Sequence, residues 1–536
     1  MSNQLSLRQP SSWLVLGCIT LLQAISGTRF SIFPTCSTTQ QQYCHFSRVQ
    51  LNNLMVASET GKLFGFLSGA AVDYLPPSMI LVIGLIFGLV GYGGQYLSIA
   101  HKIPDLSYWQ VIFLNALAGN STCWISTYCS TLAIRNFRDW QGTLIEITSS
   151  YSGLSEKIYS ILVGGIQGRK SSQNSVTYLL FTSLAPIVVG LTVAIKNYGL
   201  KCLEHRDIDM SPIAFLIAIS TGIYVVIESV APSFTHLSLQ LQAVILVLVL
   251  MIPFAVASFI ALHQFTTQKC NSQVMPEPCT DIFESKSKRV IKEFEIAIDK
   301  ERCADESKAA EVDRGTEQVL MVGNENGLKE LLIDVDFWLF YMVNACGAAV
   351  GKVYLINLEQ IFVSRSSSVA SSLFAMSCVF SFFGRNFSVM FKWYTRKKSI
   401  ISNPALTVLL ILPMPVAFFL LINDSSRCLY ISTGILGACS GALNAISAST
   451  MHEAFGCNNF VVKKTIIQTN IPLGLLVFGC LAALNYQKEG EGNHGICLGL
   501  QCYSRTFIIW GSISLAGAIL SVILLLRKQN LCSHKS

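Results

Sequence analysis

Charged residues are scarce in this chain, and the motifs of several catalytic chemistries are missing from it. Only 13% of its 536 residues are Asp, Glu, Lys or Arg, against about 25% in a typical soluble domain. The sequence contains no GxxxxGK(S/T) phosphate loop and no clustered Cys/His set with metal-ligand spacing, and His452-Glu453 lacks the second histidine of an HExxH site. These absences predict a protein that is not an enzyme, uses no cofactor or metal, and draws no energy from nucleotides.

Apolar sequence is what the chain has in abundance. Hydrophobic residues make up 51% of it, and they gather in roughly 14 stretches, each about the length that a helix needs to cross the ~30 Å hydrocarbon core of a bilayer. Because these stretches are apolar on all sides, they must face lipid or one another. We therefore expect an all-α integral membrane protein with about 12–14 transmembrane helices. The expected spans are 13–34, 50–72, 77–99, 108–134, 142–167, 175–196, 212–232, 239–263, 334–357, 367–388, 404–422, 427–450, 464–484 and 507–526.

Loop charge predicts the orientation of these spans. An even number of spans puts both termini on one side of the membrane, and the short loops on that side are the richer in Lys and Arg. Basic loops favour the cytoplasmic side, so both termini are expected in the cytoplasm; the sequence does not distinguish the plasma membrane from an endomembrane. These loops also explain the net charge of +7 without a nucleic-acid partner. The basic residues assigned to the cytoplasmic loops are Arg135, Arg138, Lys196, Lys201, Arg206, Arg385, Lys392, Arg396, Lys397, Lys398, Lys463, Lys464, Arg527 and Lys528.

The spans fall into groups separated by one charged segment. Residues 13–196 hold six spans, residues 212–263 two extra ones and residues 334–526 another six, and the ends 1–12 and 527–536 are expected in the cytoplasm. Residues 264–333 are dense in charge and lack a spanning stretch, so we expect a disordered cytoplasmic loop there. Two sets of six spans with extra helices between them are typical of a transporter built from two parallel repeats.

Most of the 18 cysteines lie inside apolar stretches, where they behave as small hydrophobic residues. Two pairs, Cys36 with Cys44 and Cys497 with Cys502, fall instead in loops assigned to the non-cytoplasmic side. A disulfide could form within either pair, and spacing alone does not decide between bonded and free thiols.

Short motifs along the chain resemble those of a known superfamily. Gly69-Ala-Ala-Val-Asp73 resembles the GxxxD half of the signature that follows the second helix of major facilitator transporters, although Tyr74-Leu75-Pro76-Pro77 replaces its basic half. More specific matches are Phe33-Pro34, Gly61-Lys62-x-Phe64-Gly65, Gly91-Tyr92-Gly93, Asn120-Ser121-x-Cys123-Trp124, Arg135-Asn136-Phe137, Asn357-x-x-Gln360 and Glu453-Ala454-Phe455-Gly456. Together these motifs are similar to those of the plant nodulin-like, nuclear-fusion-defective type of major facilitator protein.

The resemblance implies a fold of two six-helix bundles and a small-molecule or ion substrate whose transport could be coupled to protons. It also implies that Asp73 and Arg135 belong to a latch that holds one conformation. The chain departs from the family pattern at one place, because Gln141-Gly142 and Ser149 stand where the family has an Arg-Gly pair and a lysine. No role of that lysine carries over.

Ionisable residues inside the spans are candidate functional residues, because a charge at the bilayer centre costs a few kcal/mol. Glu59 and Lys62 lie three residues apart in the second span and hence on one helix face. They could form a substrate or proton site in a central cavity, or a self-neutralising pair that only packs against its neighbours.

A second set of polar residues suggests an anion site. Arg29 and Lys352 lie at similar depths in the first spans of the two halves, where they could clamp a carboxylate or phosphate or extend to the membrane surface. Asn357 and Gln360 could hydrogen-bond a ligand or tie helices together. The expected substrate-binding residues are Arg29, Glu59, Lys62, Lys352, Asn357 and Gln360.

The leading hypothesis is a secondary transporter that moves a small polar or anionic solute by alternating access. A gradient would drive it, because no nucleotide motif is present. The alternative is a non-transporting membrane receptor or organelle-fusion factor that has kept the fold and acts through the 264–333 loop. The sequence indicates no oligomeric state and no partner beyond the solute and the lipid bilayer.

Overall fold

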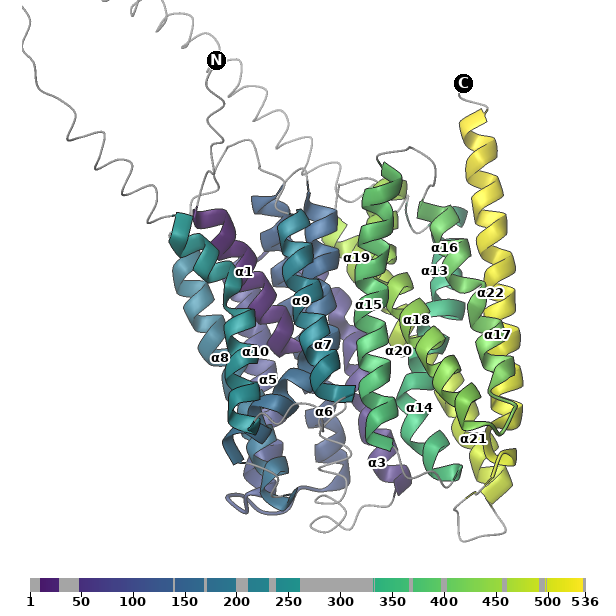
Figure 1. Ribbon diagram of the computed structural model, residues 1–536, viewed down its shortest axis with the longest axis horizontal. Coiled ribbons are helices and arrows are strands. Elements are labelled where there is room, and N and C mark those ends of the chain that lie inside the picture. Colours follow the sequence, from purple (N-terminus) through teal and green to yellow (C-terminus); the bar gives the residue numbers. More distant parts are fainter. Residues whose placement is uncertain are drawn as a thin grey trace, which may run out of the picture. The chain divides into compact units, whose positions relative to one another are not determined.

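The computed structural model is built from helices that run side by side (Figure 1). It describes residues 10–27, 48–137, 140–167, 171–198, 211–230, 238–260, 331, 333–365, 370–396, 403–455, 460–490, 497 and 499–533. Residues 258–335 form a unit separate from residues 1–257 and 336–536. The charged segment expected at 264–333 therefore lies almost wholly outside the described residues, and both helical halves belong to the larger unit.

The first half of the chain forms one group of helices, coloured purple to teal in Figure 1. Two accessory helices follow it, and the second of these bends by 46° into the short helix Ile252–Ile260. The elements of the first half are α1 (Pro10–Ser26), α3 (Arg48–Gly61), a 3₁₀ turn (Lys62–Phe64), α4 (Gly65–Ala71), α5 (Pro77–Ile99), α6 (Tyr108–Asn136), α7 (Gln141–Gln167) and α8 (Ser171–Tyr198), and the accessory helices are α9 (Ser211–Val230) and α10 (Leu239–Leu250).

The second half, green to yellow in Figure 1, contains several helices that are broken within a span. Pro413 ends α16 because it has no N–H to donate to the preceding turn, and two π-helical turns interrupt other spans. The elements are α13 (Val335–Asn344), a π turn (Ala345–Ala349), α14 (Val350–Ser364), α15 (Ala370–Arg396), α16 (Asn403–Ile411), α17 (Pro413–Leu420), α18 (Ser426–Phe455), α19 (Phe460–Gln468), α20 (Asn470–Gly474), a π turn (Leu475–Gly479), α21 (Cys480–Gly490) and α22 (Gln501–Ser533).

Every expected span overlaps one of these helices or a run of consecutive short ones within the described residues. Among the described residues, eight helices are long and apolar enough to cross a membrane, or nine if the bent pair counts as one span. The described part of α1 is apolar but too short, and α7 carries buried polar residues, among them Glu146, Ser150, Ser155 and Glu156. Inward-facing polar residues lower the mean hydropathy of a helix without preventing it from spanning.

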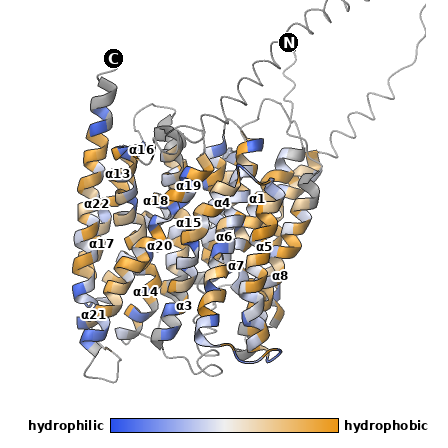
Figure 2. Cartoon of the chain, turned by 180° about the vertical axis from the view of Figure 1, so that it is seen from behind, coloured by the Kyte–Doolittle hydropathy of each residue, from blue (hydrophilic) through white to orange (hydrophobic). Residues whose placement is uncertain are grey.

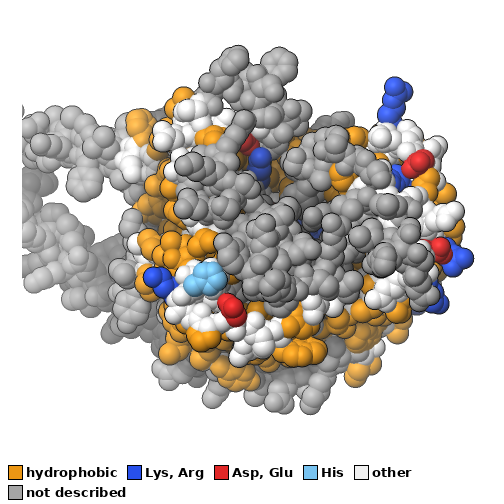
Figure 3. Space-filling model, turned by 90° about the horizontal axis from the view of Figure 1, so that it is seen from below, with side chains coloured by type: hydrophobic (Ala, Val, Ile, Leu, Met, Phe, Trp, Pro, Cys, Tyr) orange, Lys and Arg blue, Asp and Glu red, His pale blue; other side chains and the backbone are white. Residues whose placement is uncertain are grey.

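The outer faces of the helices are apolar. Large hydrophobic side chains are exposed on both halves, such as Val188, Val416 and Val477, each more than 60% exposed. Figure 2 shows hydrophobic residues along most of the helices, and the view from below in Figure 3 shows them around the rim with few charged side chains among them. An apolar surface of this extent needs lipid rather than water around it.

Glycines let the helices cross closely within each half. A Cβ atom on Gly61 of α3 would clash with the Ala116 carbonyl of α6, and one on Gly119 of α6 would clash with the Ser58 carbonyl of α3. Gly384 of α15 meets the α18 backbone in the same way. Small residues at crossings allow backbones to approach in lipid. These contacts fix α3 and α15, two of the helices that contribute charged residues to the interior.

The two halves meet along two seams. At one, α7 packs against α15 and α18; at the other, α4 and α6 pack against α19, and α3 packs against α20. Gly69, the glycine of the GxxxD motif, lies at the second seam, where a Cβ atom would clash with the Thr465 hydroxyl of α19. The accessory helix α9 contacts α7 and α15, and α10 contacts α7 and α9. The polar interior lies between these seams.

Candidate solute-binding cavity between the two halves

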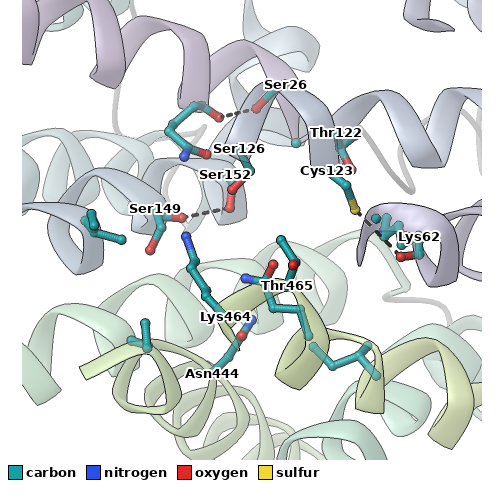
Figure 4. A pocket seen from close by; sticks show the side chains of 18 of the residues that line it. Ser26, Lys62, Thr122, Cys123, Ser126, Ser149, Ser152, Asn444, Lys464 and Thr465 are labelled. Carbon is teal, nitrogen blue, oxygen red and sulfur yellow. Dashed lines mark hydrogen bonds between the residues drawn. The ribbon is translucent and has the colours of Figure 1, made fainter. Parts of the chain in front are cut away.

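A cavity of about 940 Å³, part of it open to solvent, lies between the two halves. Figure 4 shows side chains from both halves pointing into it. Its charged lining residues are Glu59, Lys62, Arg385 and Lys464, and its polar ones include Gln23, Ser26, Thr122, Ser126, Ser149, Ser152, Asn444, Thr465 and Gln468. Because both bundles line this cavity, separation of the bundles on one side of the membrane would open it to a solute from that side.

Glu59 and Lys62 form a buried ion pair at the end of α3, with side chains 1% and 8% exposed. The Lys62 ammonium group donates to Glu59 Oε1. The α-helix changes to a 3₁₀ turn directly after Gly61, whose contact with Ala116 holds this segment against α6. The structure therefore brings together the two residues that the sequence placed on one helix face, and it also puts both on the cavity wall.

Arg385 enters the cavity from α15 of the second half. Its Nη1 donates to the Ser149 carbonyl at 2.9 Å and to Ser152 Oγ at 3.3 Å, both on α7 of the first half. Gly384 precedes it and allows the close crossing with α18. The guanidinium thus joins the two halves across the first seam.

Lys464 enters from α19 and is 5% exposed. Its Nζ donates to Ser130 Oγ of α6 at 2.6 Å, and its neighbour Thr465 contacts Gly69 of α4. Within the part of the chain that the structure describes, no carboxylate oxygen lies within 4 Å of this ammonium group. A buried cation whose acceptor is a neutral hydroxyl is well suited to bind an anion.

A second cavity of about 520 Å³ adjoins the first, because Gly27, Ser152 and Arg385 line both. Glu156 of α7 and Lys352 of α14 supply its other charges. The Cys378 thiol of α15 lies 3.9 Å from Glu156 Oε2. Charged residues of both halves therefore line two adjacent cavities.

The structure places the other predicted site residues away from these cavities. Asn357 Nδ2 donates to the Val353 carbonyl of its own helix at 2.9 Å, and Gln360 Oε1 accepts from Tyr503 of α22 at 2.8 Å. The first bond lies within α14 and the second joins α14 to α22, and neither residue lines a described cavity. Arg29 lies outside the described residues.

The two predicted latch residues lie at helix ends. Asp73 is exposed in the turn after α4, and Arg135 is exposed in the last turn of α6. Asp73 forms no ion pair with another described residue. The GxxxD motif is nevertheless at a contact between the halves through Gly69.

Several basic residues assigned to short loops belong to helices instead, and three of these residues have partly or fully buried side chains. Arg385 is well within α15, and Lys463 and Lys464 are buried in α19. The sequence predicted loops at these residues because a charged residue interrupts an apolar stretch, and such an interruption marks the expected end of a span. One signal could have revealed Arg385: Gly384-Arg385-Asn386-Phe387 repeats the pattern of Gly61-Lys62-Leu63-Phe64.

Of the two cysteine pairs, Cys497 and Cys502 are joined by a disulfide at the start of α22, and Cys36 and Cys44 lie outside the described residues. The described part of the chain contains no group of three or more His, Cys, Asp or Glu residues that could hold a metal ion.

Comparison with known proteins agrees with this architecture. The Nodulin-like family model matches residues 12–258, and the NFD4 C-terminal domain model matches residues 320–534. Protein NUCLEAR FUSION DEFECTIVE 4 of Arabidopsis thaliana is 30% identical over 534 residues, which cover 96% of this chain and 89% of that protein. The chain belongs to the Nodulin-like family. The family that the sequence motifs resembled is thereby confirmed.

Solved structures show the fold of this nodulin-like protein. The proton:xylose symporter XylE superposes with a TM-score of 0.54 and 11% identity, covering 96% of this chain and 95% of that one. A bacterial homologue of the human peptide transporters PepT1 and PepT2 gives a TM-score of 0.52 and 12% identity, covering 98% and 100%. The fold is that of the major facilitator superfamily, as predicted, and the nodulin-like protein is a multi-pass membrane protein.

Proposed function

We propose that the nodulin-like protein is a secondary transporter that carries a small anionic solute through the cavity between its halves by alternating access. The observation that supports this most is the charge of the cavity walls. The main cavity has three cations, Lys62, Arg385 and Lys464, and one carboxylate, Glu59. The adjoining cavity adds Lys352 and Glu156, so cations remain in excess.

An anion would gain more from such walls than a neutral solute. Bringing a charge to bilayer depth costs a few kcal/mol unless it is paired, and opposite charges attract more strongly where the effective dielectric constant is low. Arg385 can offer parallel N–H donors to a carboxylate or phosphate, whereas the lysines act as point charges.

The anchoring of the cations supports the proposal of alternating access. Arg385 and Lys464 both belong to the second half, and both donate to serine residues of the first half. Rocking of one bundle against the other changes these contacts, and a solute anion that replaces the serine oxygens would link its own binding to the movement.

We further propose that Glu59 couples transport to protons. It is buried beside Lys62 and shares the cavity with Cys123 of α6, Arg385 of α15 and Lys464 of α19. Protonation of Glu59 would weaken its hold on Lys62 and change the charge offered to the solute. Glu59→Gln transport should then lose its dependence on a pH gradient, and a retained dependence would refute this role.

The transport assignment is tested by reconstitution. Purified protein in liposomes is screened with labelled organic acids, amino acids and sugars, and anions should accumulate in preference to neutral sugars. Lys62→Ala, Arg385→Ala and Lys464→Ala should each abolish uptake at unchanged expression, whereas Lys102→Ala, an exposed loop control, should not. Accumulation of neutral sugars alone would contradict the proposal.

A second candidate is a membrane receptor or organelle-fusion factor on the same fold. The name of the Arabidopsis relative, which refers to defective nuclear fusion, favours it. Such a factor would work through the 264–333 segment, so deleting that segment should abolish its activity, whereas a transporter should keep its basal flux.

A further inference from the structure

We propose that a cluster of carboxamide side chains in the second half binds hydroxyl groups of the solute, so that the transported anion is a hydroxylated carboxylate of the sugar-acid type. This inference rests on the anion transport proposed above and specifies the substrate class. The cluster, which we call the amide pocket, consists of Asn344, Asn444, Gln468 and Asn470. Hydroxyl groups suit it because they both donate and accept hydrogen bonds, as carboxamides do.

The amide pocket adjoins the main cavity. Asn444 of α18 and Gln468 of α19 line both spaces. Asn344 at the end of α13 and Asn470 at the start of α20 line the pocket alone, and these two residues are 2% and 3% exposed. Among the described residues, none that lines the pocket is charged. The pocket therefore suits a neutral polar group of a solute rather than its ionised end.

The amides of this pocket have hydrogen-bonding capacity that the protein leaves unused. Asn344 Nδ2 donates to the Phe340 carbonyl of its own helix at 2.9 Å. Within the described structure, the side-chain amides of Asn444, Gln468 and Asn470 form no hydrogen bond with another residue, and Figure 4 shows Asn444 pointing into the cavity. A buried amide without a partner destabilises the folded state. Hydroxyl groups of a solute would supply the missing partners.

Two irregular stretches of backbone in the second half meet at the amide pocket. α19 ends at Gln468 and α20 begins at Asn470, and Pro472 has no N–H to donate to the Gln468 carbonyl one turn earlier. The π turn Ala345–Ala349 directly follows Asn344 and packs against α20. Broken spans and π turns are frequent at the binding sites of membrane transporters and other proteins. The breaks thus lie where the amides converge.

Lys464 indicates where the charged end of the solute would lie. Lys464 and Gln468 both line the main cavity, and they are four residues apart on α19, hence on one helix face and about 6 Å apart along its axis. Lys464 Nζ donates to the neutral Ser130 Oγ at 2.6 Å, and an anionic oxygen would be a stronger acceptor. A four-carbon hydroxy acid can therefore place its carboxylate at Lys464 and a hydroxyl group at Gln468.

Ligand-induced stabilisation of the purified full-length protein tests the inference, since a ligand stabilises the folded protein by RT ln(1 + concentration/Kd). The probes are threonate, butyrate and threitol at about pH 7, where both acids are monoanions. Threonate and butyrate share a four-carbon chain and differ in their hydroxyl groups, whereas threitol has hydroxyl groups and no charge. Threonate should bind about tenfold more tightly than butyrate, or better, because butyrate leaves the buried amides without partners.

Two substitutions that keep side-chain size test the pocket directly. Gln468→Met and Asn470→Leu should each reduce the preference for threonate over butyrate to near one. Their melting temperatures without ligand should be unchanged or higher, because each removes an amide that has no partner in the protein. Asn115→Leu is the matched control: its amide bonds to the Val111 carbonyl of its own helix at 2.9 Å and lines neither the cavity nor the pocket, so the preference should remain.

The outcomes separate this inference from the proposal on which it rests. Equal affinity for threonate and butyrate in the wild type, or a preference that survives in both pocket variants, would overturn the hydroxyl site and leave anion transport standing. Threitol binding as tight as that of threonate would overturn anion selection and leave the hydroxyl site standing. Failure of all three probes to bind would overturn both.

Discussion

Each half contains a close helix crossing at a glycine, and the cation that follows this glycine has a different electrostatic environment in each half. Gly61 and Gly384 each allow a close crossing, and each is followed by a cation that faces the cavity, Lys62 or Arg385. Two residues before each glycine the halves differ: the first has Glu59 and the second has Phe382, which is fully buried. The first half therefore neutralises its cation with a carboxylate three residues away, whereas Arg385 donates to oxygens of the opposite half.

The difference between Glu59 and Phe382 shows how two halves of similar structure can contribute unlike charges to the cavity between them. The repeat supplies the crossing and the cation, and one neighbouring residue decides whether a carboxylate lies three residues before that cation. A compensated pair can sense protons, and a cation that reaches across the interface can bind solute and sense movement.

The glycine crossings should be equally intolerant of a side chain in both halves. Gly61→Val and Gly384→Val force a β-branched group into a backbone carbonyl, and overpacking of this kind costs about 1–3 kcal/mol even when only side chains must move. We expect loss of the folded peak in size-exclusion chromatography. Gly142→Val, where a Cβ atom meets nothing within 4 Å, is the control, and folded Gly61→Val protein would refute the close crossing.

Removing the cation of the second half should reduce uptake more than removing the ion pair of the first half. Arg385→Ala removes a charged group from the solute site, and truncating one partner of a buried charged contact costs about 2–5 kcal/mol, so uptake should fall about 30-fold or more. In the double variant Glu59→Gln/Lys62→Met, both charges disappear together, and a matched removal of a buried pair is often close to neutral.

The double variant should therefore retain most of its uptake down a solute gradient, although Lys62→Ala alone leaves Glu59 without its partner. Uptake rates in the same liposomes check this. If the double variant is as inactive as Arg385→Ala, the Glu59–Lys62 pair is itself part of the solute site and the contrast between the halves fails.

The helices of this protein were largely predictable from its sequence, because a bilayer-length apolar run has few alternatives to a spanning helix. The breaks inside spans were not, since they arise from local backbone choices such as the 3₁₀ turn after Gly61 and the π turn at Ala345. Family motifs predicted the superfamily fold because the resemblance extended over both halves.

The site was only partly predictable. The spacing of Glu59 and Lys62 revealed their pairing, since helical neighbours three apart share a face. Lys464 was missed because its burial depends on Ser130, which is 334 residues away in the sequence. Asn357 and Gln360 resembled ligand-binding residues, yet polar side chains in spans serve equally well as contacts between helices, and only tertiary structure separates the two uses.

The second half also carries a covalent link near its membrane surface. Removing the Cys497–Cys502 disulfide by a double substitution to serine frees only a short loop, so the chain-entropy model gives a loss of about 2 kcal/mol. The melting temperature should fall modestly and equally with reductant or substitution. An unchanged melting temperature in the double-serine variant would show that the surrounding contacts hold the loop unaided.

The smallest effect is expected at the tether between the accessory helix and the first half. Lys157 Nζ of α7 lies 3.0 Å from Glu228 Oε2 of α9, with side chains 24% and 13% exposed. Pairs with solvent access contribute about 1 kcal/mol or less, so Glu228→Gln should lower the melting temperature only slightly and leave uptake intact. A large loss of uptake would instead make α9 part of the moving machinery.

The central claim is that cations of the second half select an anionic solute in a cavity shared by both halves. Its most direct test is the ratio of uptake rates for succinate and its neutral diamide, succinamide, in liposomes that contain wild type or Arg385→Gln. The account predicts a ratio of about ten or more in the wild type, as one buried charged contact would give, and a ratio near one in the variant. An equal preference for succinate in both proteins would contradict it.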